Sequence, residues 1–119
     1  MRGGGVCWLS TAIWRAALEA GLGTELREPH MGMVPLLAAG YDATNTLIVK
    51  NDSTVPLTLR VWLDDEQVYA AFYGDTPLDR SAEVRGPVAM GYGRYALYQD
   101  VTWRDGTQTT AEFVSHYYW

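Results

Sequence analysis

The residue with the strongest chemical character in this sequence is Cys7, the only cysteine among 119 residues. It stands at the start of residues 6–20, a segment whose alanines and leucines favour an α-helix. A thiol at a helix N-terminus is stabilised as the thiolate, the form that acts as a nucleophile. Cys7 is therefore either a reactive thiol or a small buried hydrophobe. A single cysteine cannot form an internal disulfide, so stability must come from packing, and the cellular compartment stays open.

A second group of residues with binding chemistry is aromatic. Its members alternate away from the expected core rows of their strands: Trp62, Tyr69, Tyr73 and Tyr98. Flat aromatic side chains on a sheet face suit the faces of sugar rings, as in carbohydrate-binding modules. The alternative is that these residues cover a second sheet or a subunit contact, where aromatic residues are also enriched.

The sequence has only weak features of a metal-binding, nucleic-acid-binding or membrane-spanning protein. Acidic residues cluster at 64–66 and at Asp75 and Asp79, but without the spacing of a calcium-binding loop. Two histidines, His30 and His116, and one cysteine are too few for a zinc site. We therefore expect no metal and no cofactor. The net charge of −5 argues against nucleic acid, and the apolar run near the N-terminus is too short to span a membrane.

The first 40 residues are expected to form a helix and an extended arm, followed by a β domain over residues 41–119. Ser10 or Thr11 can cap the helix, and Gly21 or Gly23 can end it. The apolar stripe of this helix docks either on its own domain or on a neighbouring subunit. The candidate interaction residues of the helix and arm are Trp8, Ile13, Trp14, Leu36 and Leu37.

Beyond residue 45 the sequence alternates with the period of β-strands. One row is expected to face the core: Leu57, Leu59, Val61 and Leu63. A second row contains Tyr95, Leu97, Gln99, Val101 and Trp103, and a bulge near Gln99 would explain its place there. Asp105-Gly106 predicts a hairpin with a type I′ turn. The expected core is built around Leu59, Val61, Tyr95 and Leu97.

Two stretches, PLTLRVWLDDEQVY and GRYALYQDVTWRDGTQTTAEF, resemble bacterial immunoglobulin-like domains at the level of architecture, over residues 45–119. The resemblance implies an antiparallel β-sandwich. It also implies that the hydroxyl of Tyr95 hydrogen-bonds to backbone at a corner of the sandwich.

Two other stretches, GVCWLSTAIWRAALEAG and GYDATNTLIVKNDS, resemble the nucleophile helix and a later strand of papain-like cysteine peptidases. The resemblance implies that Cys7 is the nucleophile, His30 the base and Asn51 the residue that orients the base. Cys7 and His30 are only 23 residues apart, which leaves no room for the domain that this family places between them.

The sequence thus predicts a mainly β protein, an antiparallel immunoglobulin-like β-sandwich with an N-terminal helix and an extended arm. The predicted function is that of a non-enzymatic structural or assembly subunit. Its helix and arm dock on a neighbouring copy or another protein partner, which gives a homo-oligomer or a larger assembly. One alternative is a carbohydrate-binding module that uses the exposed aromatic residues, and another is a remnant of a papain-like cysteine peptidase.

Overall fold

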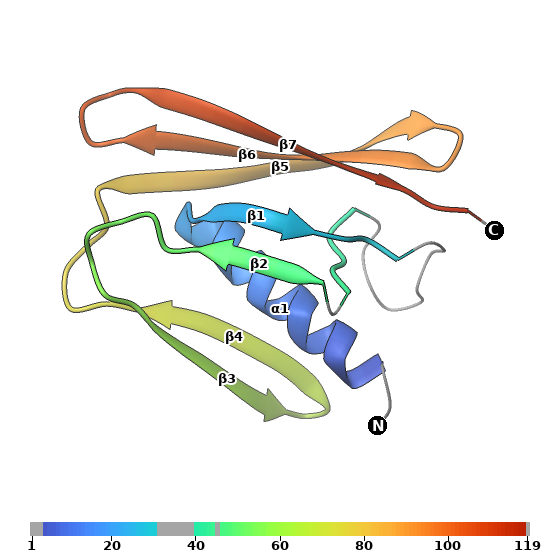
Figure 1. Ribbon diagram of the computed structural model, residues 1–119, viewed down its shortest axis with the longest axis horizontal. Helices are drawn as coiled ribbons and strands as arrows, with labels where there is room; N and C mark the ends of the chain where they lie inside the picture. Colours follow the sequence, from blue (N-terminus) through green and yellow to red (C-terminus); the bar gives the residue numbers. More distant parts are fainter. Residues whose placement is uncertain (1–3, 31–39, 45, 119) are drawn as a thin grey trace.

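The computed structural model describes residues 4–30, 40–44 and 46–118, with side chains from residue 7 onward. One helix and seven strands follow one another along the chain (Figure 1): α1 (Gly4–Ala20), β1 (Gly23–Arg27), β2 (Leu47–Lys50), β3 (Thr58–Asp64), β4 (Gln67–Tyr73), β5 (Arg80–Gly91), β6 (Arg94–Trp103) and β7 (Gln108–His116).

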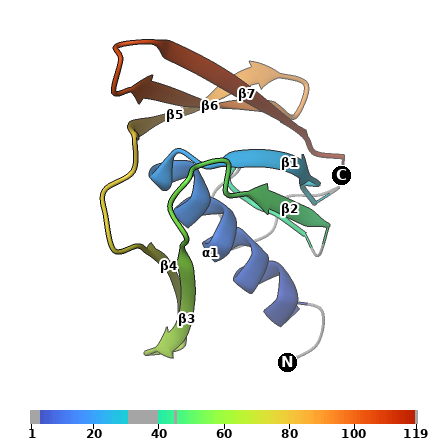
Figure 2. The ribbon, with the colours of Figure 1, turned by 60° about the vertical axis from the view of Figure 1, so that its left-hand side comes forward.

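The strands form three antiparallel sheets, with the orders β1–β2, β3–β4 and β5–β6–β7. Figures 1 and 2 show α1 between the three-stranded sheet and the β3–β4 hairpin, with the β1–β2 pair beside the helix. The prediction of a mainly antiparallel β protein with one N-terminal helix is confirmed. The finer prediction, an immunoglobulin-like sandwich, is not confirmed, because the described strands form three small sheets around a helix.

The core lies where α1 meets the β1–β2 pair and the three-stranded sheet. Its fully buried members are Trp14, Leu18, Ala43 and Leu97. Phe113 of β7 packs edge-on against Trp14, with ring centroids 5.3 Å apart. Of the two docking modes expected for the helix, the structure has the one in which α1 packs within its own chain. The predicted boundary at residue 40 stays a prediction, although residues from both sides of it share this core.

Helix α1 ends at a glycine, as expected. Gly21 has a φ of 78°, and the Gly21 N–H bonds to the Leu18 carbonyl at 3.1 Å. The Leu22 N–H bonds to the Ala17 carbonyl at 3.0 Å, which completes a Schellman motif. The predicted caps at the other end are wrong, because the helix begins at Gly4 and so contains Ser10 and Thr11 in its interior.

Strand β6 presents the predicted row to the core, with Leu97, Gln99 and Val101 buried. No bulge exists at Gln99, which pairs in continuous register with Val84 and Ala111. Its side-chain Nε2 instead donates to the carbonyls of Leu18 and Leu22, at 2.9 and 3.2 Å. The burial of Gln99 is therefore compensated by hydrogen bonds to the Leu18 carbonyl, which also accepts from the Gly21 N–H, and to the Leu22 carbonyl just beyond the end of α1.

One hairpin turn differs in type from expectation. The hairpin at Asp105-Gly106 is confirmed, with Gly106 at a φ of 91°, but Asp105 is not among the described residues with positive φ, so the type I′ turn is wrong. Successive positive φ values occur instead between β3 and β4, at Asp65 and Glu66 with φ of 50° and 63°, and between β5 and β6, at Tyr92 and Gly93 with φ of 56° and 75°.

The predicted core position of β3 is also wrong. Leu59 and Val61 are 41% and 43% exposed, and Leu63 is 70% exposed. The physical reason is that β3 is an edge strand with β4 as its partner, and α1 packs against β4. The alternation of β3 correctly identifies an apolar face, but no described element of this chain covers it.

Gly21→Ala should destabilise the protein more than Gly91→Ala. Both glycines have positive φ, so each substitution costs about 1–2 kcal/mol in backbone strain. A Cβ at Gly91 meets no atom within 4 Å, whereas one at Gly21 lies 3.0 Å from Cδ of Arg80. Arg80 is held by Gly21, Asp52 and Asp79 and cannot easily move, so Gly21→Ala should lose about 1 kcal/mol more. Urea denaturation of the two variants measures the difference, and equal losses would contradict the expectation.

Candidate functional site

A buried network of polar groups is centred on the side chain of Asp42, which is 2% exposed. One carboxylate oxygen, Oδ2, accepts hydrogen bonds from the backbone N–H of His30 at 2.8 Å and from Nδ1 of its ring at 2.6 Å. The other oxygen, Oδ1, accepts a hydrogen bond from the hydroxyl of Tyr117. The guanidinium of Arg27 lies 3.7 Å from Oδ1. Both oxygens of this buried carboxylate are therefore engaged.

Opposing effects act on the ionisation of Asp42. Burial raises the pKa of Asp42, but the hydrogen bonds from His30 and Tyr117 and the positive charge of Arg27 together bring it below its usual value. Asp42 is thus a carboxylate at neutral pH. A carboxylate only accepts hydrogen bonds, so Nδ1 of His30 must carry a proton. In the neutral ring this leaves Nε2 as the atom that can accept a proton from another group.

Arg27, at the end of β1, fixes the backbone on which Asp42 stands. Its Nε donates to the Asp42 carbonyl at 2.8 Å and its Nη2 to the Gly40 carbonyl at 3.2 Å. The guanidinium also lies over the ring of Trp14, 4.3 Å from the centroid. Burial lowers the pKa of Arg27, and the attraction of Asp42 opposes that effect. The side chain thus joins the site to the core.

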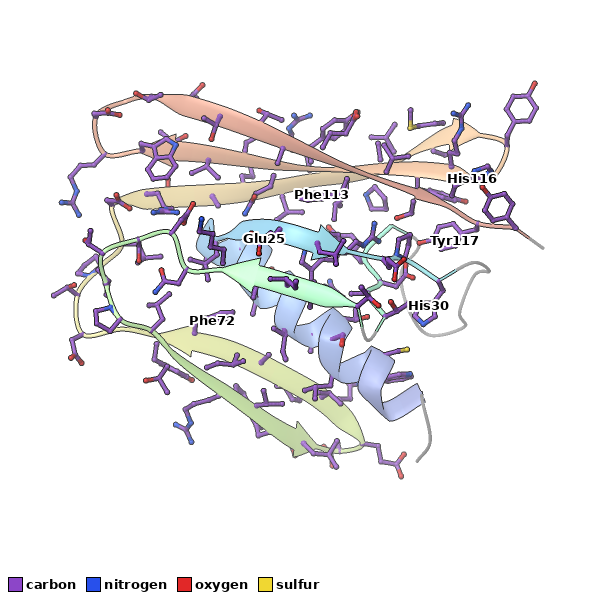
Figure 3. All side chains as sticks on the ribbon, in the orientation of Figure 1. Glu25, His30, Phe72, Phe113, His116 and Tyr117 are labelled. Atoms are coloured by element: carbon purple, nitrogen blue, oxygen red, sulfur yellow. The ribbon has the colours of Figure 1, made fainter. Side chains whose placement is uncertain are left out.

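Contacts from the middle of α1 place the helix beside the same segment. The hydroxyl of Thr11 accepts from the Ala43 N–H at 3.0 Å and donates to the Ala43 carbonyl at 3.3 Å. Arg15, one turn later, lies over the ring of Tyr41. Cys7 is one turn before Thr11, on the same side of the helix and in its first turn, and it is partly buried. Cys7 thus lies one turn from the part of α1 that contacts this segment, and Figure 3 shows His30 and Tyr117 at the end of the molecule where α1 begins.

The structure gives Asn51 a different role from the expected one. Its side chain lies in the loop after β2, where Nδ2 donates to the Val55 carbonyl at 2.8 Å and Oδ1 accepts from the Ser53 N–H at 3.1 Å. These are local turn contacts. The side chain that orients His30 is that of Asp42, which the sequence analysis missed. The available signal was a lone carboxylate in GYDAT, between a glycine turn and a β-strand.

The predicted interaction residues are divided between the core and the surface. Trp14 is fully buried in its own chain, while Trp8 and Ile13 are partly buried. Leu36 and Leu37 lie outside the described residues. A groove of about 390 Å³ between α1 and β4 is lined by Trp8 and Tyr69, among others.

The predicted aromatic face is formed in part. Trp62 and Tyr69 are paired across the β3–β4 hairpin with their rings stacked, 5.6 Å between centroids, and Tyr73 lies on the same face. Tyr98 lies on β6, in another sheet, under the guanidinium of Arg85. Trp62, Tyr69 and Tyr73 are each 41–48% exposed.

Two further findings concern the described ranges only. No three His, Cys, Asp or Glu side chains in them gather closely enough to hold a metal ion. Helix α1 is not long and apolar enough to cross a membrane.

Comparison with known protein families places part of the chain in a family. A family model described as VanW like protein matches residues 1–73, which is more than half of the chain. The matched residues include Cys7, His30 and Asp42 and end with β4. No curated protein and no solved structure matches the chain.

Asp42→Asn should make the protein less stable at neutral pH and less sensitive to acid. The folded-state pKa of Asp42 lies below the unfolded value of about 3.9, so its contribution to stability is present above that pH and is lost as pH falls through the folded-state value. At pH 7 the variant should lose about 1–3 kcal/mol, because buried donors lose a charged acceptor. Urea denaturation between pH 3 and pH 7 measures both effects. The control, Asp75→Asn in an exposed loop, should change neither, and parallel pH profiles for Asp42→Asn and the wild type would contradict the expectation.

Proposed function

The chain belongs to the VanW-like protein family, and from this premise we propose that it is a cysteine-dependent acyl-transfer enzyme with Cys7 as nucleophile, His30 as base and Asp42 as the group that orients the base. The observation that carries the proposal is the 2.6 Å hydrogen bond between Nδ1 of His30 and the buried carboxylate of Asp42. This pair stands at the end of the molecule where the helix that bears Cys7 begins. A nucleophile, a base and a group that orients the base are the parts of a catalytic triad.

In the proposed reaction, Nε2 of His30 takes the proton from the thiol of Cys7. The thiolate attacks the carbonyl carbon of an ester or amide, and the carbonyl electrons move to oxygen. When the intermediate collapses, the bond to the alcohol or amine breaks, and this leaving group takes the proton from His30. Cys7 is then a thioester, which water or a second nucleophile cleaves after losing a proton to His30. The ionised Asp42 stabilises the imidazolium formed in both steps.

The helix supports the first step in a second way. The N–H groups of its first turn have no partner within the helix, and its dipole places positive potential there. Such a site favours the oxyanion of the intermediate over the neutral carbonyl. Cys7 is the fourth residue of α1, within the reach of this effect.

The assembly function predicted from the sequence is kept as a second candidate, with a change of surface. The exposed apolar residues of β3 are Leu59, Val61 and Leu63, and they share one face of an edge strand. This favours the β3–β4 hairpin over α1 as the surface that contacts a neighbouring copy. Light scattering of the wild type and of Val61→Lys tests it. A monomeric wild type would remove the candidate.

Carbohydrate binding stays a prediction for Trp62, Tyr69 and Tyr73.

Alkylation of Cys7 by iodoacetamide tests the proposed triad without knowledge of the substrate. As the only cysteine, Cys7 gives no background. Wild-type protein should react at pH 6, where an unassisted thiol is almost entirely protonated, and His30→Ala should react about tenfold more slowly there. His116→Ala, which removes the only other histidine, is the matched control and should react as the wild type does. Equal rates for His30→Ala and the wild type across pH 5–9 would overturn the proposal.

The covalent step has its own test. Incubation with p-nitrophenyl acetate should release p-nitrophenol and leave an acetyl thioester on Cys7, which mass spectrometry detects. Cys7→Ala should show neither the release above the buffer rate nor the adduct. His30→Ala should acylate about 100-fold more slowly, the size of effect expected for loss of a general base. Wild-type protein that forms no adduct would count against acyl transfer.

A further inference from the structure

We propose that Tyr117 is a positioning residue of this site, and that its hydroxyl holds the Asp42 carboxylate in the orientation that addresses His30. The inference rests on the proposed function. It extends the site beyond residues 1–73, because Tyr117 follows β7 near the end of the chain.

The direction of the hydrogen bonds at Tyr117 is fixed by its neighbours. The backbone N–H of Gly40 donates to the Tyr117 hydroxyl oxygen at 2.7 Å. The single hydroxyl proton is therefore directed at the other partner, Oδ1 of Asp42, which only accepts. Tyr117 is 3% exposed, so water does not compete effectively for this proton.

The hydrogen bond from the Tyr117 hydroxyl restricts the rotation of the Asp42 carboxylate about its Cβ–Cγ bond. Torsions of this kind are soft, and a carboxylate with one anchored oxygen can swing. Oδ2 receives both donors of His30, whereas Oδ1 has Tyr117 and the guanidinium of Arg27 at 3.7 Å, beyond hydrogen-bond distance. Without the hydroxyl, no described hydrogen bond would hold Oδ1, and the carboxylate could turn away from Nδ1 of His30.

The hydroxyl of Tyr117 also stays protonated, which is the form that donates a hydrogen bond. Burial raises the pKa of Tyr117, and its hydrogen bond to Asp42 raises it further, while the Gly40 N–H acts in the opposite direction. The ionisable groups that contact the Asp42 carboxylate among the described residues are Arg27, His30 and Tyr117. Across the neutral range Tyr117 therefore remains a neutral donor to a charged acceptor.

The three-stranded sheet places Tyr117 accurately. Its backbone N–H bonds to the Gly93 carbonyl, in the turn between β5 and β6, at 2.9 Å. Its ring packs edge-on against that of Tyr95, with centroids 5.8 Å apart. This contact also corrects an expectation. Among the described residues, the tyrosine hydroxyl that bonds to backbone is that of Tyr117, which accepts from the Gly40 N–H, and the ring of Tyr95 packs beside it.

Tyr117→Phe in the full-length chain tests the inference, because it removes the hydroxyl and keeps the ring. Alkylation of Cys7 by iodoacetamide at pH 6 should slow about tenfold. This is the lower end of the roughly 10–100-fold loss of activity that is typical when an outer partner that orients a site residue is removed. Tyr118→Phe changes the next residue, which is 60% exposed, and should react as the wild type does. Circular dichroism should show the same folded structure for both variants.

A spectroscopic readout separates positioning from general stability. The ¹⁵N chemical shifts of the His30 ring should report a proton on Nδ1 in the wild type and a mixture of tautomers in Tyr117→Phe. If Tyr117→Phe does not fold, the inference is tested by NMR measurements on the wild-type protein. Its Tyr117 hydroxyl proton should be protected from exchange and show a cross-peak to the Gly40 amide proton, and the absence of that cross-peak would overturn the inference.

The outcomes distinguish this inference from the proposed function. If His30→Ala slows alkylation and Tyr117→Phe leaves both the rate and the His30 tautomer unchanged, the triad stands and the role of Tyr117 is refuted. If His30→Ala has no effect on alkylation, the proposed function fails. A tautomer change in Tyr117→Phe would then still support the hydrogen bond to Asp42, but without a catalytic consequence.

Discussion

The buried negative charge of Asp42 is the constraint on which this end of the molecule depends. An ionised carboxylate in the interior costs several kcal/mol unless hydrogen bonds and opposite charges replace its water. Here the replacements come from Arg27 and His30, which are close together in the sequence, and from Tyr117, which is 75 residues beyond Asp42. Folding therefore has to bring the end of β1, the segment before β2 and the segment after β7 together. The same contacts that make the charge tolerable also fix the ring of His30.

The second requirement is a helix that cannot shift along its axis. At the C-terminal end of α1, Gln99 satisfies the carbonyls of Leu18 and Leu22, and Arg80 donates to the Gly21 carbonyl at 3.1 Å. Closer to the N-terminal end, Thr11 exchanges two hydrogen bonds with Ala43. A helix bound at its C-terminal end to strands and at its middle to the Asp42 segment is restrained along its axis, and this restraint extends to its first turn. The proposed catalysis needs this, because a displacement of about 1 Å in a reacting group can cost about 100-fold in rate.

Local patterns in the sequence predicted much of this fold. Helix α1, its end at Gly21, the Asp105-Gly106 hairpin and the inward row of β6 depend on residues close together in the chain, so periodicity and turn chemistry identify them. The burial of β3 failed because alternation shows that a face is apolar and not that another element covers it. The reason for the buried Gln99 was missed because its partners in α1 are 77 and 81 residues away.

Distance along the chain also explains why the sequence predicted only some residues of the candidate site. Cys7 and His30 were identified through residue type and order, but Asn51 was taken as the third member in place of Asp42. Asn51 makes its contacts within four residues, whereas Asp42 is held by Tyr117 from 75 residues away. A pairing at that separation leaves no periodic trace in a single sequence.

The limit of the family match at residue 73 is therefore not a limit of the folded unit. Three kinds of contact cross it. Trp14 packs on Phe113 in the core, Gln99 binds the end of α1, and Tyr117 binds Asp42. If residues 74–119 formed a separate module, their removal would expose only the apolar surface where Trp14 contacts Phe113. As the chain is built, removal would also take the Gln99 donor from the Leu18 and Leu22 carbonyls and the Tyr117 donor from the buried Asp42 carboxylate, which costs more than lost apolar area alone. The three-stranded sheet is thus part of the structure that holds the site.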